Sequence, residues 1–115
     1  MSLSGNEVRV YRFEGDFGSH NFWEVQAEIE EILESGCTRL VLNVGRMTFI
    51  NSSALGYLIK TWKILNPQGG HLVLSEPTEF VTRTMSVLGL DMVFQIYPDD
   101  ETAVEALGGS TDDGG

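Results

Sequence analysis

The chain lacks most features of secreted, membrane-spanning or nucleic-acid-binding proteins. Its 115 residues include one cysteine, Cys37, which excludes an internal disulfide and fits a reducing compartment. Lys and Arg number 7 against 17 Asp and Glu, a net charge of −10 that argues against nucleic acid or an anionic membrane as partner. No run of about 18 apolar residues could insert into a bilayer, and no charged-then-apolar signal opens the chain. We therefore expect a cytoplasmic protein.

Motifs for catalysis, metals and cofactors are also missing. The two histidines, His20 and His71, lie far apart, and neither H-x-x-x-H nor C-x-x-C occurs. No G-x-S-x-G elbow surrounds Ser52 or Ser53, and no G-x-x-x-x-G-K-[ST] or G-x-G-x-x-G loop could hold nucleotide phosphates. Asp16 follows a strand and could line a site, although a turn residue is the simpler interpretation. The sequence therefore predicts no enzymatic activity, no metal and no cofactor.

The composition is that of one folded domain. With 42% hydrophobic and 10% aromatic residues the chain should form a single core. We interpret residues 1–7 as a tag remnant with a short or missing first strand, and residues 8–107 as the domain. Residues 108–115, a Gly, Ser and Asp tail, are predicted to be disordered. We expect a monomer or a weak dimer.

Strand and helix patterns alternate along the domain. Strands are predicted at 8–14, 39–44, 71–75 and 93–97, and helices at 20–35, 52–65, 77–88 and from about 98 onward. Ser19 is the expected cap of the first helix, and Pro77 the expected first residue of the third, with Phe80 and Leu88 on its buried side. The alternation predicts an α/β fold with a mainly parallel or mixed sheet.

The stretch that organises the chain is residues 47–56, which joins a buried strand to an amphipathic helix. Its polar centre, Asn51-Ser52-Ser53, falls where the first turn of a helix leaves backbone N–H groups unpaired. Asn and Ser are favoured there because a side-chain oxygen can accept from those groups. The plain interpretation of this triplet is a helix cap.

The second predicted helix also has an unusual outer face. Its core stripe is formed by Leu55, Leu58, Ile59, Trp62 and Leu65. The opposite face carries a glycine, an aromatic residue and both lysines of the chain, where a solvated helix would have charged residues that favour helix formation. We predict that a partner binds there, through Asn51, Ser52, Ser53, Gly56, Tyr57, Lys60 and Ile64.

Residues 40–56 resemble the core signature of STAS domains, the anti-sigma factor antagonists of bacteria. That signature is an apolar strand, a short turn, an apolar pair and then Asp-Ser-Ser-Gly-Leu-Gly opening a helix; this chain has LVLNV at 40–44 and SSALG at 52–56. The resemblance extends over roughly residues 8–107, and it implies a STAS fold with a mixed sheet of about four strands and about four helices. The family Asp and Gly are replaced here by Asn51 and Ala54.

The resemblance implies a phosphorylation-controlled protein-binding switch. In such antagonists the first serine of the pair is phosphorylated by an anti-sigma factor that is also a serine kinase, and the matching residue here is Ser52, with Ser53 as the alternative. The unmodified form binds the anti-sigma factor, and the phosphorylated form does not.

Two other functions remain open. The first is a non-phosphorylated STAS scaffold or subunit of a larger assembly, such as a stressosome or a membrane-transport complex; Asn51 in place of the family Asp favours it. The second is a small-ligand-binding STAS module for nucleotide or lipid, which would use the strand ends near Asp16 and the loop before Asn51.

Overall fold

The computed structural model describes residues 7–109. Within them the chain forms, in order, β1 Arg9–Arg12, β2 Gly15–Phe17, α1 Phe22–Glu34, β3 Arg39–Asn43, β4 Met47–Ile50, α2 Ser52–Leu65, β5 His71–Ser75, α3 Glu79–Val87, β6 Ile96–Tyr97 and α4 Asp100–Ala106. Two 3-10 turns, Asn66–Gln68 and Leu90–Met92, follow α2 and α3. The predicted α/β fold with four helices is confirmed.

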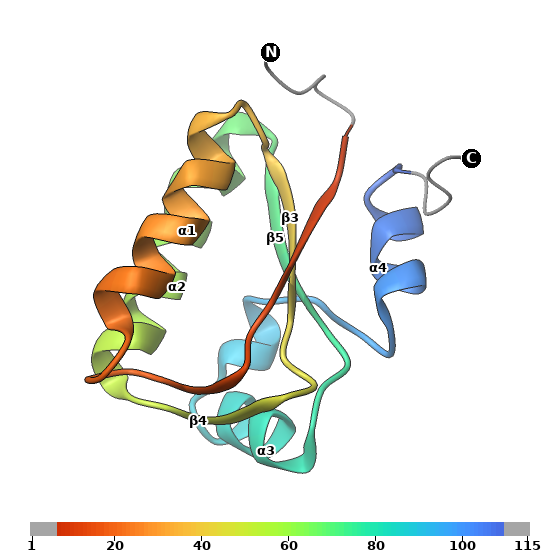
Figure 1. Cartoon of the computed structure of the whole chain (residues 1–115). Coiled ribbons are helices and arrows are strands. Elements are labelled where there is room, and N and C mark those ends of the chain that lie inside the picture. Colours follow the sequence, from red (N-terminus) through yellow and green to blue (C-terminus); the bar gives the residue numbers. More distant parts are fainter. Residues whose placement is uncertain (1–6, 110–115) are drawn as a thin grey trace.

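The main sheet has four strands in the order β1-β3-β5-β6. Every strand pair described in this sheet is parallel, so residues 7–109 contain no antiparallel strand of the kind that a mixed sheet requires. In a parallel sheet all carboxyl ends meet at one edge, and the loops leaving that edge are where α/β folds usually place their functional groups. Here that edge carries the loops that lead into β4 and α3 and, near β6, into α4 (Figure 1).

Helices cover both faces of the main sheet, as Figure 1 shows: α1 and α2 lie on one side and α4 on the other. Side chains alternate along a strand, so Leu40 and Leu42 of β3 join the core under α1 and α2, while Val41 packs against α4 with Val73 of β5. Coverage of both faces explains the nearly continuous apolar run of β3, as expected for a parallel strand.

A second, two-stranded sheet pairs β2 with β4 in parallel. The sequence predicts Gly15-Asp16-Phe17-Gly18 to end the first strand as a turn, but residues 15–17 form a strand of their own. Phe17, fully buried, anchors β2 in the core. Two glycines within four residues favoured a turn, and nothing local revealed the distant partner strand. Together with α3, this sheet closes the lower end of the molecule in Figure 1.

Two helices begin later than predicted. Ser19 does not cap α1: the N-cap is Asn21, which makes no side-chain capping bond. Pro77 does not open α3, because Thr78 is the N-cap and its Oγ1 accepts from the backbone N–H of Val81 at 3.1 Å. Thr78 is a strong capping residue, whereas Pro supplies no oxygen side chain, so the cap sets the start.

Exposure differs from the prediction on α3, and one strand is shorter than predicted. Phe80 and Leu88, expected in the core, are 36% and 54% exposed. The strand expected at 93–97 is reduced to residues 96–97, because residues 90–92 form a 3-10 turn.

The expected domain boundaries fall largely at the ends of the described chain. Residues 1–6 and 110–115, which include most of the predicted tag and tail, lie outside the described residues. At the start of the predicted tail, the Gly109 N–H donates to the carbonyl of Val104 at 2.9 Å.

Candidate functional site

Ser52 is the first residue of α2, directly after the cap that the sequence predicts. Asn51 has an extended backbone, and its Oδ1 accepts from the N–H of Ala54 at 2.8 Å. The prediction that Asn51 caps this helix is therefore confirmed. Ser52 and Ser53 are both exposed, and within residues 7–109 neither hydroxyl has a hydrogen-bond partner. Both hydroxyls are accessible to solvent.

The electrostatics around Ser52 favour an added anion. The first turn of α2 contains no acidic residue, and the whole helix has none, although the chain carries 17 Asp and Glu. Unpaired N–H groups and the helix dipole stabilise negative charge at this end. A phosphate on Ser52 would therefore meet a helix terminus without a nearby carboxylate of its own helix to repel it.

The outer face of α2, for which the sequence predicts a bound partner, is largely exposed to solvent. Ser52, Ser53, Gly56 and Lys60 are exposed, and Ile64 is 53% exposed. An added Cβ on Gly56 would meet nothing within 4 Å, so the packing of this chain does not require glycine there. The glycine leaves the helix backbone uncovered at this position.

Tyr57 lies differently from the other predicted binding residues. It is half-buried between α2 and α1, with its ring edge-on to Phe22 at 5.8 Å and its hydroxyl 3.4 Å from Oε2 of Glu30. Burial, and then the neighbouring Glu30 carboxylate, raise the pKa of Tyr57 to about 12. Tyr57 thus helps to join the two helices, and only its edge can contact a partner. The helical period alone could not show on which flank of α2 the first helix packs.

The loop between β2 and α1 holds the cap of α2 in place, a contact that the sequence analysis missed. A Cβ on Gly18 would lie 2.8 Å from Nδ2 and 2.9 Å from Cγ of Asn51. The N–H of Asn51 donates to the carbonyl of Phe17 at 3.1 Å, and the N–H of Gly18 donates to Oδ1 of Asn21 at 3.0 Å. The position of Ser52 at the start of α2 therefore depends on residues more than 30 positions earlier in the chain.

Gly18→Ala is expected to destabilise the fold by about 1 kcal/mol, because the new methyl group displaces the Asn51 side chain from its cap. Urea unfolding of four proteins measures this: wild type, Gly18→Ala, Asn51→Ser and the double variant. Serine still caps the helix but lacks the Cγ and Nδ2 atoms that clash, so in that background Gly18→Ala should cost almost nothing. An equal cost in both backgrounds would show that Gly18 is required for another reason.

A second polar cluster lies at the carboxyl edge of the main sheet. Oδ1 of Asp100 accepts from Nδ2 of Asn43 at 2.9 Å and from Oγ of Ser75 at 2.6 Å, and Oδ2 accepts from Nη2 of Arg12 at 2.7 Å. Asn43 and Ser75 are buried at the ends of β3 and β5. The carboxylate therefore ties the start of α4 to three strands. Two polar residues that end apolar strands were the signal that could have identified this cluster.

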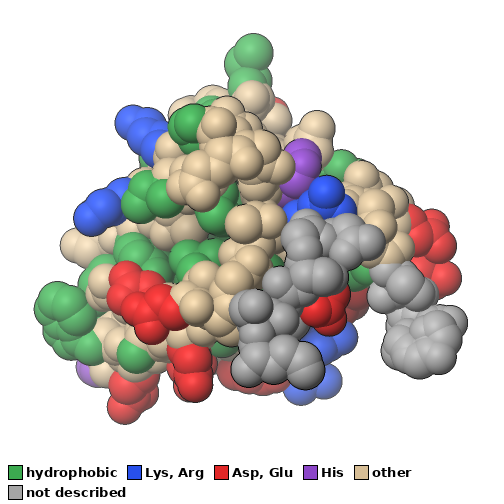
Figure 2. Space-filling model, turned by 90° about the horizontal axis from the view of Figure 1, so that it is seen from above, with side chains coloured by type: hydrophobic (Ala, Val, Ile, Leu, Met, Phe, Trp, Pro, Cys, Tyr) green, Lys and Arg blue, Asp and Glu red, His purple; other side chains and the backbone are tan. Residues whose placement is uncertain are grey.

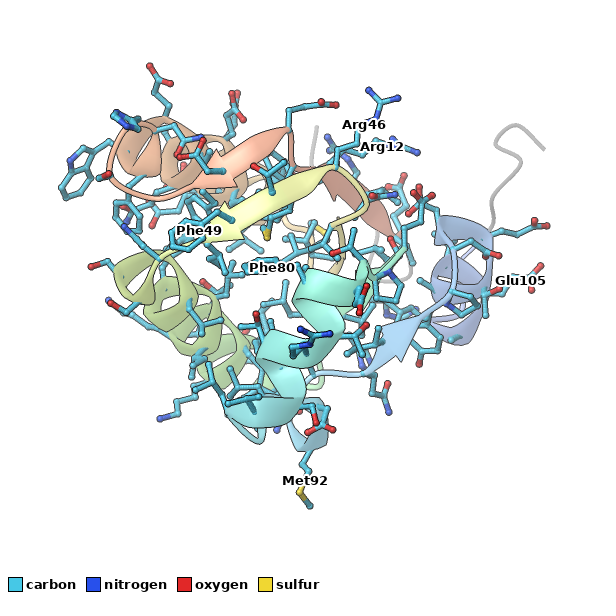
Figure 3. All side chains as sticks on the ribbon, turned by 90° about the horizontal axis from the view of Figure 1, so that it is seen from below. Arg12, Arg46, Phe49, Phe80, Met92 and Glu105 are labelled. Atoms are coloured by element: carbon cyan, nitrogen blue, oxygen red, sulfur yellow. The ribbon has the colours of Figure 1, made fainter. Side chains whose placement is uncertain are left out.

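A cavity of about 320 Å³ lies beside this cluster. Its lining is formed by Arg12, Phe13, Glu14, Asn43, Arg46 and Glu76. Figure 3 shows Arg12 and Arg46 together at this edge, away from Phe49. Both arginines already have carboxylate partners, Asp100 for Arg12 and Glu14 for Arg46 at 3.5 Å, so the cavity offers no unpaired positive charge.

The remaining residues of interest do not gather into a chemical site. Asp16, proposed above for a ligand module, is exposed on β2, and its carbonyl accepts from Nδ2 of Asn21. Among residues 7–109, no three His, Cys, Asp or Glu side chains are placed to hold a metal ion. Cys37 is buried, and burial raises the pKa of its thiol. No helix in the described part of the chain has the length and apolar character needed to cross a membrane.

Comparisons with known proteins agree with this geometry. The family model of the STAS domain matches residues 4–103. An anti-sigma F factor antagonist of Paenibacillus polymyxa is 26% identical over 101 residues, covering 87% of this chain and 86% of the relative.

Solved structures share the fold. An anti-sigma factor antagonist from Mycobacterium paratuberculosis is 20% identical, with a TM-score of 0.78, covering 94% of this chain and 92% of the other. The Bacillus cell fate determinant SpoIIAA, solved in its phosphorylated form, is 21% identical with a TM-score of 0.68 and covers 92% and 96% of the two chains.

Proposed function

Because the chain belongs to the STAS domain family, we propose that it is an anti-sigma factor antagonist, whose binding to an anti-sigma factor is controlled by phosphorylation of Ser52. It acts by binding, and the enzyme of the pair is the partner, a serine kinase. The observation that carries the proposal is the exposed hydroxyl of Ser52 at the N-terminus of α2, which has no hydrogen-bond partner among residues 7–109. Control of sigma factors would place this activity in the cytoplasm.

The unmodified protein binds its partner through the open face of α2. This surface comprises Asn51, Ser52, Ser53, Gly56, Lys60, Ile64 and the edge of Tyr57. The two serines and the glycine have small side chains, so a partner can pack closely against the first turns of the helix. Close packing removes water from the Ser52 hydroxyl, and this makes the contact sensitive to charge.

Phosphorylation would change the interface without changing the fold. A phosphate adds roughly −1.5 to −2 charges and three acceptor oxygens. In the free protein these oxygens face water, the helix dipole and an acid-free first turn, so the modified protein stays folded. In the complex the same group would have to be desolvated against a surface shaped for a hydroxyl, and the partner is released.

Incubation with a purified anti-sigma factor kinase and ATP tests the proposal. Intact-mass spectrometry should show one added phosphate on the wild type and on Ser53→Ala, and none on Ser52→Ala. If only Ser53→Ala fails to gain the phosphate, Ser53 rather than Ser52 is the acceptor. Stable binding with no modification of any variant would favour the scaffold function, and a small molecule that copurifies with the protein would favour the ligand module.

A further inference from the structure

Two aromatic side chains form an exposed pair close to the start of α2. Phe49 of β4 is 52% exposed and Phe80 of α3 is 36% exposed, and their ring centroids lie 6.1 Å apart at a tilt of 33°. Figure 3 shows them side by side where β4 meets the first turn of α3. Phe49 is three residues before Ser52 on the same connecting segment.

An exposed aromatic pair is unfavourable in water, and contiguous exposed apolar surface commonly marks an interaction site. Single exposed apolar residues need no such explanation. Here, however, two rings from separate elements are in contact, and one of them lies on β4, the strand that leads directly into the start of α2 with Ser52.

We propose that Phe49 and Phe80 together form the apolar anchor of the surface that Ser52 controls, and that they insert into an apolar socket bordered by carboxylates on the anti-sigma factor. This inference rests on the function proposed above. It adds the side of the molecule on which the partner lies, from α2 across β4 to α3, and the chemistry of the partner's surface.

The size of a stable interface supports this extension. A specific complex buries about 800 Å² on each partner and usually depends on a few aromatic or arginine anchors. Beside two serines and a glycine, the exposed face of α2 offers only Ile64 and the edge of Tyr57 as apolar side chains, which is too little by itself. The Phe49–Phe80 pair supplies large, rigid apolar area next to Ser52.

Charge indicates what kind of molecule binds there. α2 holds Lys60 and Lys63, the only lysines of the chain, and no acid. Figure 2, which views the molecule from above, shows blue side chains at the upper left, away from the red ones, and further blue side chains near the centre and the lower edge. A partner with carboxylates around its apolar socket complements this helix. Two copies of this chain, each with a net charge of −10, would instead repel one another as whole molecules.

The test titrates a purified anti-sigma factor kinase with this protein by calorimetry, with ADP in place of ATP so that Ser52 stays unmodified. Phe49→Ser and Phe80→Ser should each weaken binding by about tenfold or more. Met92→Ser is the matched control: Met92 is 89% exposed and lies at the far end of α3 from the pair (Figure 3), so its binding should stay within about twofold of the wild type. Thermal unfolding should show that all three variants are folded, with the two phenylalanine variants slightly less stable than the wild type because each loses the contact between the rings.

Further outcomes separate this inference from the proposed function. If both phenylalanine variants bind like the wild type while Ser52→Asp prevents binding, Phe49 and Phe80 are not the anchor, but control of binding at Ser52 is supported. If the wild type does not bind the kinase at all, both the proposed anchor and the proposed function are contradicted. If sedimentation shows a wild-type dimer that Phe80→Ser dissociates, while kinase binding is unchanged, the pair serves self-association and the inference is overturned.

Discussion

Ser52→Asp is expected to weaken binding of the anti-sigma factor by about 100-fold or more, because an unpaired carboxylate buried in an interface typically costs several kcal/mol. The free protein should be as stable as the wild type or slightly more stable, since an acid in the first turn of a helix is favourable by about 0.3–1 kcal/mol. Calorimetric titration and urea unfolding of the same preparation measure the two effects.

A matched control separates position from net charge. His71 is exposed at the start of β5, at the opposite edge of the main sheet from the start of α2 (Figure 1). His71→Asp adds the same charge, and it should leave binding nearly unchanged. Equal loss in both variants would mean that long-range repulsion, rather than a contact at Ser52, governs the association. Unchanged binding in Ser52→Asp would contradict the proposed switch.

The largest effect on stability is expected from Asp100→Ala, at about 3 kcal/mol. The substitution leaves the amide of Asn43 and the hydroxyl of Ser75 without their acceptor, and these two residues are 4% and 0% exposed. A buried donor without a partner costs about 1–3 kcal/mol. Urea unfolding followed by circular dichroism measures the loss directly.

Two further variants divide this loss between its sources. Asp100→Asn keeps an oxygen that can accept from both buried donors, but it places an NH2 group opposite Arg12 in place of Oδ2. The ion pair and its hydrogen bond are therefore lost, and the Arg12 side chain, which is 62% exposed, can turn into water. We expect it to cost about 1 kcal/mol or less. Glu101→Ala, at the neighbouring exposed position, should change stability by no more than about 0.5 kcal/mol. If Asp100→Asn is as damaging as Asp100→Ala, the ion pair is the main contribution.

Local rules were sufficient where a single segment determines the structure. The bounds predicted for α2 and β5 are those observed, because each has a clear period and a clear stop. Asn51 was identified as the cap of α2 because capping depends only on the next three residues. The alternation of strand and helix was enough to predict the α/β class.

Features that depend on distant segments could not be predicted in this way. The pairing of β2 with β4 joins residues about 30 positions apart, and the turn-like composition at Gly15 concealed it. The position of Tyr57 depends on where α1 packs, and the role of Asp100 depends on three strands, β1, β3 and β5. The spacing of Phe80 predicts a core position. However, α3 packs at the lower end of the molecule in Figure 1, and the side of the helix that carries Phe80 stays partly exposed.

The contact between Gly18 and Asn51 would affect how the proposed kinase selects its target. A short synthetic peptide spanning residues 47–60 would contain every atom of the acceptor serine and its neighbours, yet it would lack the upstream loop that orients them. Recognition would then report on conformation rather than on linear sequence, and misfolded or newly synthesised copies would go unmarked. Signalling through this serine would therefore depend only on molecules that have completed folding.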